Sequence, residues 1–200
     1  MQEITTYFAP HRLDEALQAM ADADATVLCG GTDLAPQTES GARRYQAKLL
    51  NIRRVQGLGA IDTTGAEIRI GATTSVAAIR RHAALAAIAP VLAEAAEHFA
   101  SEQIRNAASL GGNLCNASPA GDLSPPLLVL GAAAELACWR GGAVQTRRVP
   151  LGPSTLSLEL HACTTDAATW AVAFADVGDP ARVGPALIEL RDALVANLAA

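Results

Sequence analysis

The first third of the chain alternates between strand-like and helix-like spacing of its hydrophobic residues. Residues 5–8 are typical of a short strand, and residues 11–22 place apolar side chains at helical spacing. A second apolar run over 26–29 ends at Gly30-Gly31. The pattern predicts a strand, a helix, a second strand and a glycine turn.

The middle of the chain contains two further apolar runs before its periodicity fades. Residues 47–52 and 67–72 predict strands, and Thr74 or Ser75 precedes a predicted helix as its N-cap. A helix is also predicted over 88–99, because apolar residues recur at helical spacing after Pro90. Between 102 and 131 the periodicity fades, and residues 104–126 are rich in Gly, Asn, Ser, Pro and Asp, which predicts a long loop that is either disordered or built around something.

The last third mixes strand and helix patterns. Residues 127–130 predict a helix, and residues 134–139 and 144–150 predict two strands joined by a glycine turn. A strand near 170–174 and an amphipathic helix over 183–198 follow. The mixed order predicts an α+β fold.

Composition excludes several classes of protein. The chain has 200 residues, of which 50% are hydrophobic and 4% aromatic, and it carries a net charge of −5. An acidic chain without long basic runs is a poor nucleic-acid binder, so no nucleic-acid partner is expected. The apolar runs are shorter than the roughly 20 residues of a spanning helix, and the start lacks a secretory signal, which predicts no membrane span and a cytoplasmic location.

The cysteines and histidines show no ligand spacing. Cys29, Cys115, Cys138 and Cys163 form no C-x-x-C pair, so we expect each to be a small buried residue and propose neither a metal nor a disulfide. No G-x-S-x-G is present, so no catalytic nucleophile is assigned.

Two glycine pairs carry the strongest chemical indication. They occur in Gly30-Gly31-Thr32-Asp33 and in 109–113 (SLGGN). Glycines let the main chain approach a ligand closely, so that successive N–H groups can bind a diphosphate, with hydroxyl and amide side chains as further donors. The single lysine follows no G-x-x-x-x-G, which excludes a P-loop.

Two other residues each have two readings at this point. Asp122, in the turn 118–122 (SPAGD), is either an acceptor for a nucleotide or the N-cap of the following helix. Phe99 is either an ordinary core aromatic or the lining of an aromatic cofactor, and its spacing favours the core.

Taken together, residues 27–34 (VLCGGTDL) and 103–132 (QIRNAASLGGNLCNASPAGDLSPPLLVLGA) resemble one known family. The chain is similar to the FAD-binding, or medium, subunit of molybdenum hydroxylases of the xanthine dehydrogenase and aerobic carbon monoxide dehydrogenase type. The similarity runs from about residue 5 to about residue 160, with weaker matches at 49–58 and 68–79 in the same order.

The resemblance implies a two-lobed FAD-binding fold of the vanillyl-alcohol-oxidase (PCMH-like) type, with extended FAD between the lobes. It implies that both glycine motifs hold the pyrophosphate, that Asp122 of the turn 118–122 binds the nucleotide end, and that Phe99 touches the cofactor. The residues expected to bind FAD are Val27, Leu28, Cys29, Gly30, Gly31, Thr32, Asp33, Leu34, Gly71, Thr74, Phe99, Ser109, Leu110, Gly111, Gly112, Asn113, Ser118 and Asp122.

The resemblance also implies partners and a role. A large subunit would carry molybdopterin and a small subunit two [2Fe-2S] clusters, and FAD would pass their electrons to NAD, oxygen or a quinone. The implied domains are an N-terminal lobe over 1–57, a second lobe over 58–150, and a linker with a shortened C-terminal region over 151–200. A scaffold with weak or no FAD binding and a stand-alone flavin oxidoreductase are the alternatives.

Overall fold

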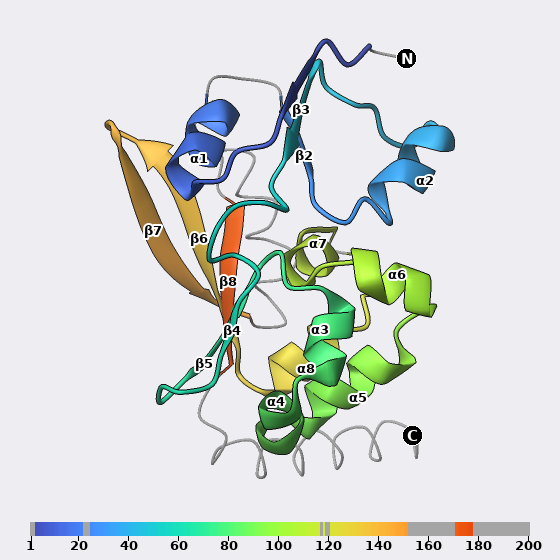
Figure 1. Cartoon of the computed structure of the whole chain (residues 1–200), viewed down its shortest axis with the longest axis vertical. Helices are drawn as coiled ribbons and strands as arrows, with labels where there is room; N and C mark the ends of the chain where they lie inside the picture. The colour runs from blue at the N-terminus through green and yellow to red at the C-terminus, as the bar shows by residue number, and fades with distance from the viewer. Residues whose placement is uncertain (1–2, 22–24, 117, 119–120, 152–170, 178–200) are drawn as a thin grey trace, which may run out of the picture.

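The computed structural model describes residues 3–21, 25–116, 118, 121–151 and 171–177, and their strands form two sheets (Figure 1). The first is a three-stranded parallel sheet in the order β1-β3-β2, with β1 at Thr6–Phe8, β2 at Ala25–Leu28 and β3 at Lys48–Asn51. Helix α1 (Leu13–Ala21) follows β1 and helix α2 (Leu34–Glu39) follows β2. The first motif therefore lies at the carboxyl end of β2.

The second sheet has five antiparallel strands in the order β4-β5-β8-β6-β7. They are β4 (Ile61–Asp62), β5 (Ile68–Gly71), β6 (Ala133–Arg140), β7 (Ala143–Pro150) and β8 (Ala171–Val177). The β6–β7 hairpin turns at Gly141 and Gly142, whose φ values of 61° and 79° suit the tight turn predicted there. Strand β8 lies between β5 and β6, so part of the region 151–200 belongs to this sheet.

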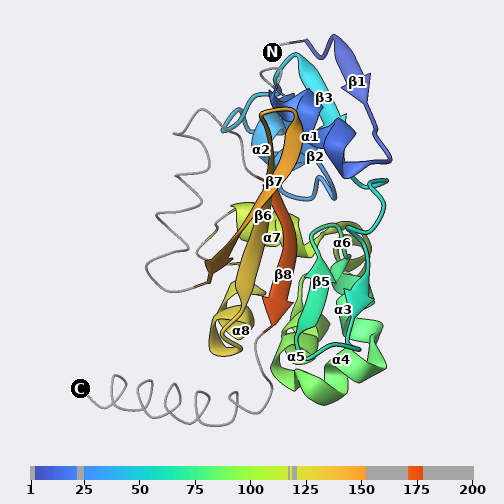
Figure 2. The same cartoon turned by 90° about the vertical axis from the view of Figure 1, so that its left-hand side faces the viewer.

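Short helices cover one face of the antiparallel sheet (Figure 2). Ile68 and Ile70 of β5 face this layer while Arg69 between them is exposed, the alternation expected of a half-buried strand. The helices are α3 (Val76–Arg81), α4 (Ala83–Ile88), α5 (Pro90–His98), α6 (Glu102–Ala107), α7 (Leu110–Asn116) and α8 (Ser124–Val129).

The prediction of a long loop over 104–126 is wrong, because α6, α7 and the start of α8 occupy most of it. The helix predicted at 127–130 is confirmed by α8, which begins three residues earlier. Glycines inside α7 and prolines in the first turn of α8 hide the helical pattern. Proline is compatible with a first helical turn, and packing against neighbours outweighs the low helix propensity of glycine. Ser75 is confirmed as the N-cap of α3, since its Oγ accepts a hydrogen bond from the N–H of Ala78 at 3.1 Å.

The two sheets are joined by α1. Ala16 and Leu17 of this helix share a core cluster with Ala137 of β6, so α1 packs between the parallel sheet and the antiparallel sheet (Figure 1). Val55 and Leu58, from the connection after β3, complete the same cluster. This packing fixes the parallel sheet next to the antiparallel one and sets the position of the glycine motifs.

Candidate cofactor-binding site

The structure brings the two glycine motifs together. A Cβ built on Gly30 would lie 2.2 Å from the carbonyl oxygen of Ala107, at the end of α6. One α7 residue also reaches the first motif, because Asn116 Nδ2 donates to Asp33 Oδ2 at 3.2 Å. Segments separated by about eighty positions in the sequence therefore form one site, with α6 and α7 on one side and the β2–α2 turn on the other.

The first motif, 27–34, keeps its main-chain donors. Gly31 has a φ of +73°, a conformation that favours glycine, and helix α2 begins three residues later at Leu34. Among the described residues, none accepts a hydrogen bond from the backbone N–H groups of 30–34. Five successive donors at a turn are the arrangement that binds an anion.

The second motif uses its main-chain donors within the protein. The N–H of Leu110 donates to the Thr74 carbonyl at 3.0 Å and that of Gly111 to the Ala72 carbonyl at 2.8 Å. The N–H of Gly112 donates to Ser109 Oγ at 3.2 Å, and that of Asn113 to the Ser109 carbonyl at 3.0 Å. The prediction that the N–H groups of this motif are open to a diphosphate is therefore wrong for these four, because the chain after β5 accepts from two of them and Ser109 accepts from the other two.

Gly111 of the second motif and Gly71 of β5 each pack directly against another segment of the chain. A Cβ on Gly111 would lie 2.8 Å from both the Cβ and the carbonyl oxygen of Ala72. A Cβ on Gly71 would lie 2.1 Å from the carbonyl oxygen of Leu58. Both positions thus require glycine for close approach of two chain segments, independently of any ligand.

Three other predicted site residues are buried in the fold. Ser109 is 3% exposed and Thr74 is 2% exposed, and the Thr74 hydroxyl donates to the Ala60 carbonyl at 3.4 Å. Phe99 is 8% exposed and belongs to the main core cluster, directly after α5. The structure thus gives Phe99 the core position that its spacing favours.

Asp122 lies beside the second motif on the outside of the fold. Helix α8 has Leu123 as its N-cap and no side-chain cap hydrogen bond, so the N-cap reading of Asp122 is wrong. The Leu123 N–H instead donates to Asn113 Oδ1 at 3.3 Å, which ties this turn to α7. The exposed carboxylate of Asp122 and the half-buried Ser118 lie at either end of the turn between α7 and α8.

Two residues that link the first motif to α7 are absent from the predicted site residues. Gln37 Nε2 donates to Asn116 Oδ1 at 3.0 Å, and Asn116 in turn donates to Asp33. Helical spacing is the available indication, since Gln37 lies four residues after Asp33 and Asn116 three residues after Asn113.

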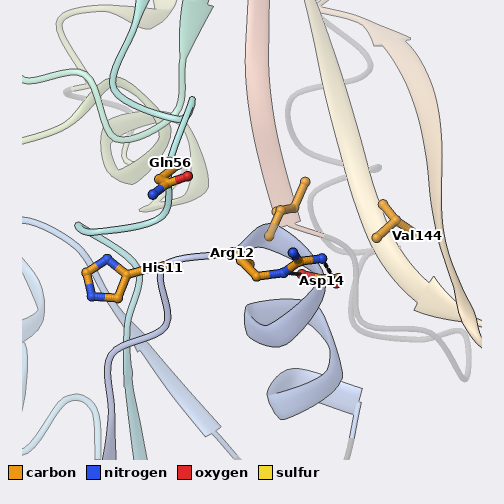
Figure 3. A pocket seen from close by; sticks show the side chains of 6 residues that line it. His11, Arg12, Asp14, Gln56 and Val144 are labelled. Atoms are coloured by element: carbon orange, nitrogen blue, oxygen red, sulfur yellow. Dashed lines mark hydrogen bonds and ion pairs between the residues drawn. The ribbon is translucent and has the colours of Figure 1, made fainter.

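A separate surface pocket of about 410 Å³ lies at the start of α1 (Figure 3). No predicted site residue lines it; the lining residues are His11, Arg12, Leu13, Asp14, Gln56 and Val144. Arg12 and Asp14 form an ion pair there at 2.6 Å, and this hydrogen bond lowers the pKa of the Asp14 carboxyl.

Other predictions concern single residues and ions. Cys138 is buried as expected, but Cys29 is half-buried and Cys115 is exposed. Cys163 and the helix predicted over 183–198 lie outside the described residues. In the described ranges, no three His, Cys, Asp or Glu side chains group as metal ligands. No helix in the same ranges is long and apolar enough to cross a membrane.

Comparison with known proteins gives consistent matches. Residues 2–160 match the family described as "FAD binding domain in molybdopterin dehydrogenase". The xanthine dehydrogenase FAD-binding subunit of Escherichia coli O157:H7 is 30% identical over 167 residues, which cover 80% of this chain and 55% of that protein. The 6-hydroxypseudooxynicotine dehydrogenase complex subunit alpha of Paenarthrobacter nicotinovorans is 33% identical over 147 residues, 72% of this chain and 48% of that protein.

Solved structures agree with these relatives. The Cu,Mo-CO dehydrogenase in its cyanide-inactivated form matches with a TM-score of 0.76 at 25% identity, over 90% of this chain and 61% of that one. Quinoline 2-oxidoreductase from Pseudomonas putida 86 has the same fold, with a TM-score of 0.77 at 24% identity over the same shares. This chain spans about half the length of the curated relatives it matches.

Proposed function

Because this chain belongs to the family of FAD-binding domains of molybdopterin dehydrogenases, we propose that it is the flavin-carrying part of a molybdenum hydroxylase. FAD, the cofactor expected from the sequence, is the cofactor of this family. The role as an oxidoreductase subunit, the partners and the two-lobed vanillyl-alcohol-oxidase type of fold form part of the same proposal.

One structural observation supports the proposal more than any other: the main-chain donors of 30–34 are available at a turn that lies against the end of α6 and is hydrogen-bonded to α7. The doubly negative diphosphate of FAD suits these N–H groups. The nucleotide end would be held by Asp122 and Ser118, and Asn113 fixes the turn that carries them. Gly71, Thr74, Gly111 and Phe99 would act by shaping the fold around the site.

Bound FAD supplies the chemistry, since it can take up electrons singly and release them in pairs, while the protein supplies position and electrostatics. The names of the relatives support a complex, because one is called an FAD-binding subunit and another a medium subunit. We therefore propose a molybdopterin-containing large subunit and a [2Fe-2S] small subunit as partners, with NAD, oxygen or a quinone as electron acceptor. A cytoplasmic location remains a prediction.

The test is FAD binding by the purified 200-residue chain. Binding is measured by titration of flavin fluorescence and by the visible absorbance of the protein after dialysis. We expect a yellow protein that retains FAD and turns over little NADH without partners. A chain that takes up no added FAD would favour the scaffold alternative. Rapid NADH oxidation by the FAD-loaded chain alone would favour the stand-alone flavin enzyme.

A matched pair of variants locates the site. Gly31 and Gly57 both have positive φ, at +73° and +82°, so an alanine at either position adds similar backbone strain. Gly31→Ala disturbs the donor turn and should weaken FAD binding by about tenfold or more, the effect of one lost charge-assisted hydrogen bond. Gly57→Ala, which has open space around its Cβ, should bind FAD like the wild type. Equal affinities of the two variants would place the diphosphate elsewhere.

A further inference from the structure

The side chain of Asn116 connects α7 to the first motif and to α2 through both ends of its amide. Its Nδ2 donates to Asp33 Oδ2 at 3.2 Å, and its Oδ1 accepts from Gln37 Nε2 at 3.0 Å. We call the three residues Asp33, Asn116 and Gln37 the amide bridge. Because a carboxylate only accepts and an amide N–H only donates, one orientation of the Asn116 amide satisfies both contacts.

The amide bridge holds α2 to α7 through polar side chains. Asp33 and Gln37 lie one turn apart at the start of α2, and the N–H of Gln37 donates to the carbonyl of Asp33 at 3.0 Å. Asn116 is the last residue of α7. Asp33 is exposed and the two amides are half-buried, so the amide bridge adds orientation to the α2–α7 contact and little apolar burial.

We propose that Asn116 is a positioning residue for FAD: it holds the donor turn 30–34 at a fixed angle to α7. This inference rests on the proposed function and extends it to a residue outside both glycine motifs. The N–H groups of the turn bind a diphosphate well only when they keep one orientation before binding.

The amide bridge also controls a negative charge. The carboxylate of Asp33 belongs to the same turn as the N–H donors, where it would repel a diphosphate if it moved over them. The donor of Asn116 keeps this carboxylate on the α7 side. Loss of the donor thus loosens the turn and frees a charge of the wrong sign, and both effects weaken FAD binding.

Four variants of the full chain test the proposal: N116A, N116D, D33N and the double variant D33N/N116D. We expect N116A to bind FAD about tenfold more weakly. N116D should be weaker still, because it places a second carboxylate against Asp33. The double variant restores the hydrogen bond with reversed polarity, since the amide introduced at position 33 donates to the carboxylate introduced at position 116, and Gln37 still donates to that carboxylate.

The decisive measurement is the FAD dissociation constant, by fluorescence titration, across this cycle. D33N/N116D should bind FAD at least about tenfold more tightly than N116D. The gain in FAD affinity from D33N should therefore be larger in the N116D background than in the wild-type background, whereas two independent substitutions would give the same factor in both. Circular dichroism should show the same helix content in all four variants, because the Gly30–Ala107 contact and the core remain.

A second readout needs no FAD. Hydrogen exchange of the α2 amides in the FAD-free protein should be faster in N116A and N116D and return towards wild type in the double variant. Wild-type FAD affinity in N116A and N116D would overturn the inference while leaving the proposed function intact. A wild-type chain that binds no FAD would overturn the proposed function, and unchanged α2 exchange in the single variants would then reject the amide bridge as well.

Discussion

Gly30 tests whether a motif glycine is required by the fold itself. In Gly30→Ala, the new Cβ would lie 2.2 Å from the carbonyl oxygen of Ala107, 2.8 Å from its carbon and 3.0 Å from the Cα of Ala108. A carbon and a carbonyl oxygen normally stay about 3.3 Å or more apart, so the two segments must separate by about 1 Å. Both partners are backbone atoms, and no side-chain rotation relieves the clash.

The structural cost of this substitution can be estimated. Overpacking of a well-packed contact costs about 1 to 3 kcal/mol, and the rigid obstacle here puts Gly30→Ala near the upper end, at about 3 kcal/mol. With a urea m-value of about 2 kcal/mol/M, the unfolding midpoint should fall by about 1.5 M. The same separation moves the donor turn away from α6 and α7, so FAD affinity should fall too.

The assay is urea unfolding of the FAD-free chain, followed by circular dichroism, with FAD titration of the folded protein in parallel. Gly59→Ala is the control, because its Cβ would make an ordinary contact of 3.5 Å with Thr73 Oγ1 and should change stability by less than about 0.5 kcal/mol. An unchanged unfolding midpoint in Gly30→Ala, with FAD affinity alone reduced, would refute the packing argument and show that this glycine serves only ligand approach.

Three further predictions concern the fold around the site. Gly71→Ala places a Cβ 2.1 Å from the carbonyl oxygen of Leu58 and should destabilise the FAD-free chain by about 3 kcal/mol, measured by urea unfolding. The Arg105 side chain, 13% exposed, donates to three carbonyl oxygens at the end of α5. Arg105→Met should lower the free energy of unfolding by about 2 kcal/mol, measured by thermal unfolding. Arg105→Lys should regain less than half of this lost stability. The pKa of the Glu102 carboxyl is lowered by its hydrogen bond with Arg105 and by the charge of Arg80. At pH values above about 4.3, the ordinary pKa of a glutamate, the wild type should therefore have a higher Tm than Glu102→Gln. This advantage should disappear as the pH falls further; a pH-independent difference in Tm would contradict the ion-pair assignment.

Alternating hydrophobicity and glycine punctuation were sufficient to predict most strands. The strands predicted at 5–8, 26–29, 47–52 and 67–72 lie within about two residues of β1, β2, β3 and β5. These runs are short, apolar and bounded by turn residues, so local sequence and tertiary structure agree. The α+β class follows from the same pattern and is confirmed.

The sequence pattern mainly fails to predict helices whose residues have low intrinsic helix propensity. Helix α7 contains Gly111 and Gly112 and shows no apolar period in isolation. In α8 two prolines follow the first residue, so the sequence predicts only the later part of this helix, at 127–130. These helices persist because Leu110, Leu114 and Leu127 are fully buried in the core beneath the antiparallel sheet. Such burial depends on residues distant in sequence and is invisible to a local pattern.

Site prediction from the sequence found the glycine motifs but not the state of their hydrogen bonds. Whether an N–H group is open to a ligand depends on which carbonyl lies next to it in the fold. The Ala72 and Thr74 carbonyls take the donors of Gly111 and Leu110, and no spacing rule connects these pairs. Gln37 and Asn116 are not predicted from the sequence for the same reason, because their contact joins two different helices.

The two motifs have similar sequences but contribute in different ways to the proposed binding of FAD. The first offers backbone donors on a turn, and the second is a packed segment whose Asn113 side chain holds the turn that carries Asp122. A change that alters backbone geometry should thus affect FAD binding more in the first motif, whereas a change of side chain should affect it more in the second. Because the amide bridge is a polar link between the first motif and α7, its loss should resemble a backbone change in the first motif although the altered residue lies on α7.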